Sequence, residues 1–211
     1  MKLPYKKALI LAPHTDDGEF GCGGTISRLI REGCEVKYIA FSDCKESVPA
    51  GFPIDILRKE LMNATDVLGI KKQSVTILDY KVRYFPRDRQ AILEDLVKIK
   101  ISYKPDVVFT PCSYDIHQDH NTVYQESIRA FKTSTIFGYE LPWNNFTLPS
   151  NGIIKLEKED IENKVKAIAK YESQTKRGYS DSDYLRSLAQ TRGVRIGKEF
   201  AEAFEIIRYI L

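Results

Sequence analysis

A short apolar run that leads directly into a histidine and a group of acids constrains this chain more than any other feature. Residues 8–12 are all apolar, and His14, Asp16, Asp17 and Glu19 follow within a few positions. Such a run is typical of a strand buried on both faces of a parallel sheet. The glycines behind the acids would let a helix begin close against that sheet. We therefore expect the polar residues, and the chemistry, at the carboxyl end of this first strand.

The composition predicts one globular domain with no specialisation for a polyanionic partner. The chain has 211 residues, enough for one sizeable core, and no Gly/Ser/Pro-rich linker or repeat divides it, so we expect residues 1–211 to form a single domain. Its 32 basic and 29 acidic residues give a formal charge of only +3, spread along the sequence. This balance gives no reason to expect binding to nucleic acid or to an anionic membrane.

The N-terminus and the cysteines indicate a cytoplasmic protein. The first apolar run is about half the length of a minimal signal-peptide core and stops at Pro13. No run approaches the roughly 18 apolar residues needed to cross a bilayer, so membrane insertion is not expected. The four cysteines form no C-x-x-C pair and are expected to be small buried side chains in a reducing compartment. The expected partner is a small molecule, and the sequence leaves homo-oligomerisation open.

Strand-like and helix-like segments alternate along the chain. The predicted strands are 8–12, 35–41, 75–78, 106–110, 135–139 and 153–156. The predicted helices are 23–31, 52–68, 88–104, 119–131, 159–171 and 184–189. Residues 199–211 fit either a helix or a strand, and we predict a helix. This order favours an α/β fold with a Rossmann-like, doubly wound, mostly parallel sheet of strand order 3-2-1-4-5 and an irregular C-terminal extension.

All three histidines of the chain follow predicted strands. His14 ends the first strand, and His117 and His120 follow the strand that ends at residue 110. In the order 3-2-1-4-5 these two strands are neighbours, and such folds bind ligands in the crevice at their carboxyl ends. The imidazoles should therefore meet there, together with three carboxylates. These acids are Asp16, Asp17 and Asp119. Imidazoles with a carboxylate and no thiolate are typical of a catalytic divalent-metal site, with zinc as the first choice and iron or cobalt as alternatives.

The glycines do not fit a dinucleotide-binding fingerprint. Counted from Gly21 and Gly23, the third glycine of that fingerprint is due at Ile26. The acids at the start of the helix would also repel a pyrophosphate. A nicotinamide cofactor is therefore not expected.

Two spaced motifs carry a family resemblance. Residues 12–24 read A-P-H-T-D-D-G-E-F-G-C-G-G, and residues 117–120 read H-Q-D-H. They resemble the motifs (A/P)-H-P-D-D-E-x-x-x-G-C-G-G and H-x-D-H of the PIG-L/LmbE-like zinc-dependent N-acetylglucosaminyl deacetylases, which include enzymes of GPI, mycothiol and bacillithiol synthesis. The similarity extends loosely over most of the chain, including 60–69 and 201–204.

The resemblance implies that His14, Asp17 and His120 bind the metal and that Asp16 is the general base. General chemistry agrees with this division. A metal-bound water has its pKa lowered toward neutrality, and a carboxylate beside a ligand can take its proton as the water attacks an amide carbonyl.

The resemblance further implies that His117, as an imidazolium, stabilises the oxyanion or protonates the leaving amine, and that Asp119 orients His117. Amide hydrolysis needs the amine protonated as it leaves. His117 is the nearby side chain that titrates near neutrality.

The sequence departs from the family pattern at three positions. Thr15 stands where a proline is usual, and Gly18 where a glutamate is usual. Leu57 occupies a position on the second predicted helix where the family often has an arginine that grips substrate hydroxyls. We assign that substrate-binding role to Arg83, in the loop after the third strand, with Arg58 as the alternative.

Two further sites could contact a substrate. Trp143, in an aromatic and amide-rich loop, is a candidate to stack on a sugar face, and the alternative is that it fills the core. Arg192 and Arg195 could read a phosphate or nucleotide, although a solvated surface cluster is the favoured interpretation.

The sequence thus predicts a zinc-dependent hydrolase that removes an N-acyl group such as acetyl from an amino sugar or its conjugate. Two alternatives stay open. One is another metallohydrolase, such as a phosphoesterase, although three histidines furnish few of the extra ligands that two-metal phosphoesterases use. The other is an inactive sugar- or nucleotide-binding module.

Overall fold

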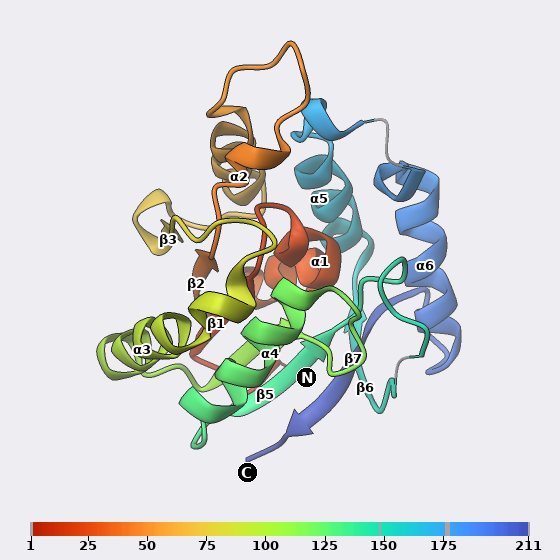
Figure 1. The fold of residues 1–211 in the computed structure, drawn as a ribbon. Coiled ribbons are helices and arrows are strands. Elements are labelled where there is room, and N and C mark those ends of the chain that lie inside the picture. Colours follow the sequence, from red (N-terminus) through yellow and green to blue (C-terminus); the bar gives the residue numbers. More distant parts are fainter. Residues whose placement is uncertain (1, 148, 176–177, 211) are drawn as a thin grey trace.

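A seven-stranded sheet forms the centre of the computed structural model, which describes residues 2–147, 149–175 and 178–210 (Figure 1). The strands are β1 (Lys7–Ala12), β2 (Glu35–Ala40), β3 (Val75–Ile77), β4 (Val107–Pro111), β5 (Thr135–Tyr139), β6 (Gly152–Leu156) and β7 (Phe200–Arg208). Their order is β3-β2-β1-β4-β5-β7-β6. The first five are parallel and follow the predicted order 3-2-1-4-5. The sheet as a whole is mixed, because β7 pairs antiparallel with both β5 and β6.

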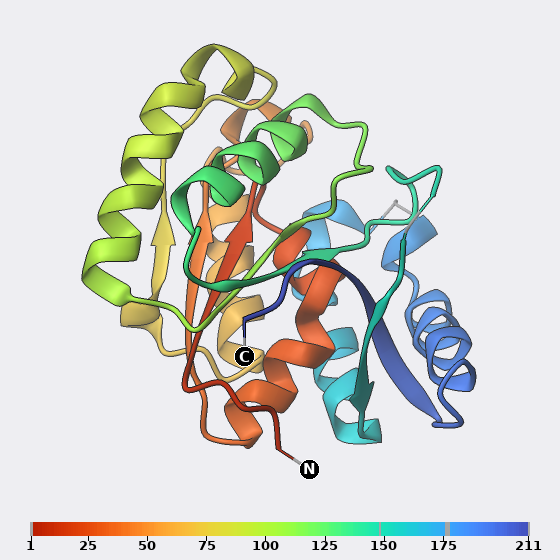
Figure 2. The same ribbon diagram turned by 90° about the horizontal axis from the view of Figure 1, so that it is seen from below.

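Six α-helices in the described part of the chain cover the two faces of this sheet (Figure 2). They are α1 (Asp17–Arg31), α2 (Ile56–Val67), α3 (Phe85–Tyr103), α4 (Gln118–Ala130), α5 (Lys158–Ile168) and α6 (Ser182–Val194). Helices α3 and α4 pack on one face, and α1, α2, α5 and α6 pack on the other. No helix in the described part of the chain is both long enough and apolar enough to cross a membrane.

The strand β1 is buried on both faces, as its apolar run predicts. Ala8, Ile10 and Ala12 belong to the core beneath α1 and α2, whereas Leu9 and Leu11 belong to the core beneath α3 and α4. The neighbouring strand β4 runs parallel to β1, with Ala8 opposite Val107 and Ile10 opposite Phe109. The segments that follow β1 and β4 therefore leave the sheet side by side.

The helix predicted over residues 199–211 is wrong, because Phe200–Arg208 forms the strand β7. Alanine and glutamate favour helix locally, but this segment pairs with a strand on each side and is buried over its first five residues. Tertiary pairing thus overrides local propensity. The apolar residues Phe200, Ala203, Phe204 and Ile207 have the helical spacing i, i+3, i+4 and i+7, so the local pattern does not reveal the strand.

Helix α1 begins at Asp17, six residues before the predicted start, and contains a break. Cys22 has a non-helical backbone, with φ −148° and ψ 26°. The glycines around it allow close packing from the sheet: a methyl group on Gly21 would overlap the ring of Tyr139, and one on Gly24 would lie 2.6 Å from Leu156. The four cysteines of the chain are buried free thiols.

Candidate metal centre

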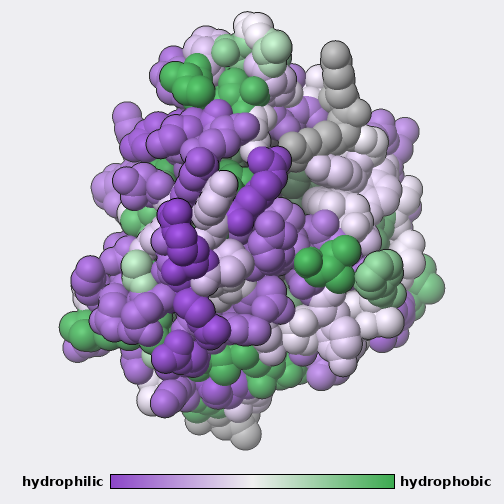
Figure 3. All heavy atoms as spheres, viewed as in Figure 1, coloured by the Kyte–Doolittle hydropathy of each residue, from purple (hydrophilic) through white to green (hydrophobic). Residues whose placement is uncertain are grey.

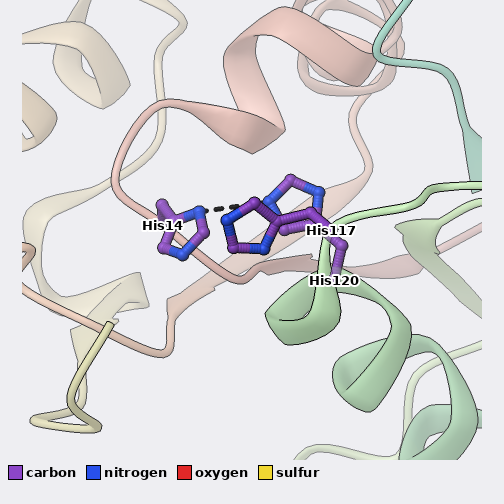
Figure 4. Close-up of side chains that lie close together, drawn as sticks. All are labelled: His14, His117 and His120. Carbon is purple, nitrogen blue, oxygen red and sulfur yellow. Dashed lines mark hydrogen bonds between the residues drawn. The ribbon is translucent and has the colours of Figure 1, made fainter. Parts of the chain in front are cut away.

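Three side chains converge at the carboxyl ends of β1 and β4. His14 lies in the turn between β1 and α1, Asp17 begins α1, and His120 lies in the first turn of α4. Nδ1 of His14 is 3.1 Å from Nε2 of His120, and Oδ2 of Asp17 is 3.3 Å from the first nitrogen and 3.2 Å from the second. Figure 4 shows the ring of His14 pointing toward the two histidines that come from the start of α4. The structure thus brings together the three residues predicted as metal ligands.

The distances within this triangle suit a tetrahedral metal ion. With bonds of about 2.0–2.1 Å, two ligands of a tetrahedral zinc ion lie about 3.3–3.4 Å apart. Two imidazole nitrogens and one carboxylate oxygen also match the donor set of a catalytic site that keeps a position open for water or substrate. His14, Asp17 and His120 could therefore hold a divalent transition-metal ion, although the donor set does not distinguish zinc from iron or cobalt.

A carboxylate holds the outer nitrogen of each histidine in the triangle. Nε2 of His14 lies 3.1 Å from Oδ2 of Asp119, and Nδ1 of His120 lies 2.7 Å from Oδ2 of Asp115. A carboxylate partner keeps the proton on the outer nitrogen, which leaves a lone pair on the inner one. Both rings are therefore fixed in the tautomer that a metal ion requires.

The same carboxylates control the protonation of the cluster. Burial alone would lower the pKa of His14, but hydrogen bonds to Asp119 and Asp17 raise it. Burial opposes the charge on His120 too, yet Asp17 and Asp115 raise its pKa to about 10. Burial would raise the pKa of Asp17, whereas His120 and His14 hold it well below its usual range. Metal binding must displace protons here, so its affinity depends on pH.

His117 is the N-cap residue of α4 and lies beside the triangle. The three histidines can each offer one nitrogen within 4.8 Å of the others. Nδ1 of His117 accepts the backbone N–H of Asp119 at 3.2 Å, so its proton resides on Nε2. Burial, reinforced by His120 and His14, lowers the pKa of His117 to about 4. The ring is thus a neutral N–H donor at neutral pH, whereas the resemblance implies an imidazolium.

The carboxylate of Asp119 orients His14, where the resemblance implies that it orients His117. Its Oδ2 accepts from Nε2 of His14 and from the backbone N–H of Arg83 at 2.6 Å. Its Oδ1 accepts the backbone N–H of Phe85 at 3.3 Å. The physical reason is the position of Asp119 in the first turn of α4, where its side chain meets the 83–85 loop and only its backbone reaches His117.

Asp115 is a site residue that the sequence reasoning missed. It is 4 % exposed, and besides holding His120 it accepts the backbone N–H of His117 at 2.9 Å through Oδ1. An aspartate two residues before a histidine in a loop is the pattern of a side-chain-to-backbone turn, and this was the available signal. Asp115 thus fixes both the loop and the ring of His120.

A cavity of about 330 Å³ opens onto the cluster. Asp16 lines it, and its side chain makes no capping hydrogen bond to α1. Arg83 also lines it, with an exposed side chain and a left-handed backbone of φ 73° that the bond to Asp119 holds. Leu57 forms part of the wall, whereas Arg58 lines a separate surface hollow.

Trp143 contributes an aromatic wall to the cavity. Its ring stacks on Tyr179, with 3.8 Å between ring centroids and 13° between planes, and Phe20 packs edge-on against both. One face of Trp143 is therefore covered by protein.

Figure 3 shows hydrophobic side chains gathered over the loop that precedes α2, where Phe52 and Ile54 are exposed.

Arg192 and Arg195 have partners away from this cavity. Arg192 makes a two-pronged pair with Glu140, at 2.8 and 2.7 Å, and Arg195 bonds to Ser150. Neither lines the cavity beside the metal cluster. We therefore interpret Arg192 and Arg195 as structural residues.

A buried tyrosine pair holds the turn that carries His14 and the acids. The hydroxyls of Tyr38 and Tyr171 donate to the carboxylate of Glu19 at 2.5 and 2.9 Å and lie 3.2 and 2.7 Å from the carbonyl of Thr15. Burial raises the pKa of Glu19 to about 8, against the effect of these hydrogen bonds. Gly18 leaves room for Tyr38, because a methyl group there would lie 2.6 Å from that ring.

A buried ion pair spans the break in α1. Nζ of Lys164, on α5, donates to the carbonyl of Phe20 at 2.6 Å and to Glu202 at 2.7 Å. Glu202, on β7, accepts the backbone N–H groups of Gly24 and Thr25 at 3.0 and 2.7 Å. The cation thus caps the end of the first half of α1, and the anion caps the start of the second.

Comparisons with known proteins find a matching family, similar sequences and a similar solved structure. Residues 9–131 match the family described as PIG-L, GlcNAc-PI de-N-acetylase. The chain is 31% identical over 147 residues to the uncharacterized deacetylase YaiS of Escherichia coli K12, which covers 67% of this chain and 78% of that protein. It is 25% identical over an alignment of 226 residues to diacetylchitobiose deacetylase of Thermococcus kodakarensis, covering 96% and 83%. The solved N,N'-diacetylchitobiose deacetylase of Pyrococcus horikoshii superposes with a TM-score of 0.79 and 29% identity, over 97% of this chain and 84% of that one.

Proposed function

The chain belongs to the PIG-L (GlcNAc-PI de-N-acetylase) family, and from this membership we propose that it is a metal-dependent hydrolase that removes the N-acetyl group of an amino sugar or its conjugate. The observation that carries the proposal is the triangle of His14, Asp17 and His120, whose sides of 3.1 to 3.3 Å lie at the cavity. The names of the diacetylchitobiose deacetylases support an acetylated amino sugar as the substrate class.

In this proposal His14, Asp17 and His120 hold the metal, with zinc as the first choice. The bound ion would lower the pKa of a water molecule and polarise the amide carbonyl. Asp115 and Asp119 would keep the two imidazoles in the metal-binding tautomer through their bonds of 2.7 and 3.1 Å.

Asp16 is the proposed general base. It follows the turn of His14, precedes a proposed ligand and lines the same cavity, so it lies on the wall that a water molecule bound there would meet. It would take a proton from the attacking water. The same carboxyl, once protonated, would then supply the proton that the leaving amine needs.

His117 is the proposed oxyanion donor. Because its Nδ1 accepts the backbone N–H of Asp119, its Nε2 keeps a hydrogen to donate. A fixed N–H group of this kind stabilises negative charge that develops on the amide oxygen. Burial lowers the pKa of His117 and so favours the neutral ring, and we therefore assign amine protonation to Asp16.

Arg83 and Trp143 are the proposed substrate-binding residues. Arg83 lines the cavity and is exposed, as a residue that contacts the outer part of a substrate would be. The stacked Trp143 and Tyr179 present an apolar surface on which a sugar ring could pack.

The test is release of primary amine from a panel of N-acyl amino-sugar conjugates, assayed as purified, after chelation and after addition of zinc. We expect amine release from at least one member, its loss on chelation and its return with zinc. Cleavage of phosphate esters without amine release from any member would contradict the proposal and favour a phosphoesterase.

A further inference from the structure

We propose that Gln174 determines substrate specificity, with its side-chain carbonyl oxygen accepting a hydrogen bond from a ring hydroxyl of the amino sugar. The inference rests on the proposed deacetylase function and adds a residue to it. Gln174 ends the short 3₁₀ turn Glu172–Gln174, which follows α5, and it lines the cavity that also contains His14 and Arg83.

A buried carboxylate anchors this turn to α2. Glu60 is 3 % exposed, and it accepts the backbone N–H of Ser173 at 2.8 Å and the hydroxyl of Ser173 at 2.6 Å. Glu60 lies one helical turn after Leu57, which is itself in the cavity wall. Residues three apart share a face of a helix, so Glu60 holds Ser173 against the side of α2 that faces the cavity.

The hydrogen bonds through Ser173 fix which end of the Gln174 amide faces it. An ionised carboxylate can only accept, so the single hydroxyl proton of Ser173 goes to Glu60. The serine oxygen can then only accept, and it does so from Nε2 of Gln174 at 3.1 Å. The amide nitrogen of Gln174 therefore faces Ser173, and its carbonyl oxygen, Oε1, faces away.

The carbonyl oxygen of Gln174 belongs to a residue of the cavity wall. Gln174 is only 6 % exposed, yet within the described ranges no protein group donates to Oε1. Thr25 is the one described residue with a fully buried side-chain polar atom that lacks a partner, so Oε1 of Gln174 is not completely buried. A fixed, accessible acceptor in a cavity selects a ligand that offers a donor.

Sugar hydroxyls are donors that this acceptor can read. The neighbouring wall residue Leu57 has no polar side-chain atom, so it cannot provide such a bond. A site that holds an oriented acceptor disfavours an analogue that lacks the matching hydroxyl, because the acceptor is then left unpaired. Gln174 would therefore discriminate between amino sugars by the hydroxyl they present.

The experiment compares Gln174→Met, which keeps the length of the side chain, with wild type on the best substrate of the panel and on its 3-, 4- and 6-deoxy analogues. We expect kcat/KM of Gln174→Met to fall about tenfold on the parent substrate, mainly through KM, as for loss of one hydrogen bond. On one deoxy analogue the two enzymes should be equal, because the partner hydroxyl is gone. Gln190→Met, at an exposed position of α6, is the matched control and should behave as wild type.

Gln174→Ala serves as a second variant, which should show the same loss on the parent substrate and no loss on the same deoxy analogue. Thermal unfolding of each variant is measured beside the kinetics, and the comparison between substrates within one variant does not depend on its stability. An unchanged kcat/KM, or an equal loss on all four substrates, would overturn the role of Gln174 while leaving the deacetylase function intact. Absence of amine release by the wild type would instead overturn the proposed function, and the inference with it.

Discussion

At the residue scale, two carboxylates behind the histidines prepare the site for a cation. Asp115 holds the outer nitrogen of His120, and Asp119 holds that of His14. Asp119 also accepts two backbone N–H groups from the loop that carries Arg83. A proposed metal ligand and a proposed substrate residue are therefore tied to one carboxylate, so a change there would affect both.

Replacing Asp115 with asparagine should weaken metal binding. The amide cannot accept the imidazole N–H with the strength of a carboxylate, and it leaves the tautomer of His120 less well fixed. We expect zinc affinity to fall about 10- to 100-fold. A competition titration with a chromophoric chelator measures this. The exposed Asp66→Asn, on α2, is the control and should match wild type, whereas equal affinity in both variants would contradict the role of Asp115.

Sequence reasoning could bring the segments of His14, Asp17 and His120 together from strand order, and the family resemblance then implied these three as the ligands. Both segments directly follow neighbouring strands, so the ends of these strands already fix where the motif residues lie. Asp115 and Gln174 could not be identified in this way. The bond between Asp115 and His120 depends on how the loop after β4 turns. The orientation of Gln174 depends on hydrogen bonds that run from Glu60 on α2 through Ser173 in the turn after α5.

At the element scale, the position of the broken helix α1 determines where Asp16 and Asp17 lie relative to the cavity. The break at Cys22 gives α1 two halves, and each half presents a terminus inside the protein. Lys164 and Glu202 satisfy these termini, with side chains only 5 % and 6 % exposed. The direction of the first half, which begins at Asp17, is therefore set by residues from α5 and β7.

Replacing Lys164 with methionine should be strongly destabilising. It removes the cap of the first half of α1 and leaves Glu202 buried without its counter-ion, which costs about 3–5 kcal/mol in comparable pairs. The double variant Lys164→Met/Glu202→Gln should recover part of this loss, because it carries no buried charge. Urea unfolding measures both. A double variant less stable than Lys164→Met would show that the charge on Glu202 is not the source of the cost.

The elements that the sequence predicted well are those whose local pattern agrees with their environment. The apolar run of β1 is buried on both sides, as its composition requires. The strand β7 and the first turns of α1 were missed because distant partners decide them: β7 by pairing with β5 and β6, and the glycine-rich start of α1 by Tyr139 and Lys164.

At the scale of the whole molecule, the two ends of the chain depend on each other. The last strand, β7, completes the sheet beside β5 and supplies Glu202 to α1, near the start of the chain. The C-terminal third is therefore part of the support for the site. We propose that residues 1–211 form a single domain.

The single-domain proposal predicts one cooperative unfolding transition. Trp143 is the only tryptophan of the sequence. It lies in the loop after β5 and stacks on Tyr179, in the C-terminal third of the chain. Its fluorescence and the far-UV circular dichroism should give coincident denaturant curves. An earlier fluorescence transition would show that the C-terminal third unfolds separately.

The most direct test of the account compares Asp16→Ala with Asp17→Ala, measuring bound metal and amine release on the same samples. Asp17 belongs to the ligand triangle, whereas Asp16 lines the cavity beside it. The account predicts that Asp16→Ala keeps its metal and loses turnover, while Asp17→Ala loses both. Metal lost from Asp16→Ala and retained by Asp17→Ala, or full amine release by Asp16→Ala, would contradict it.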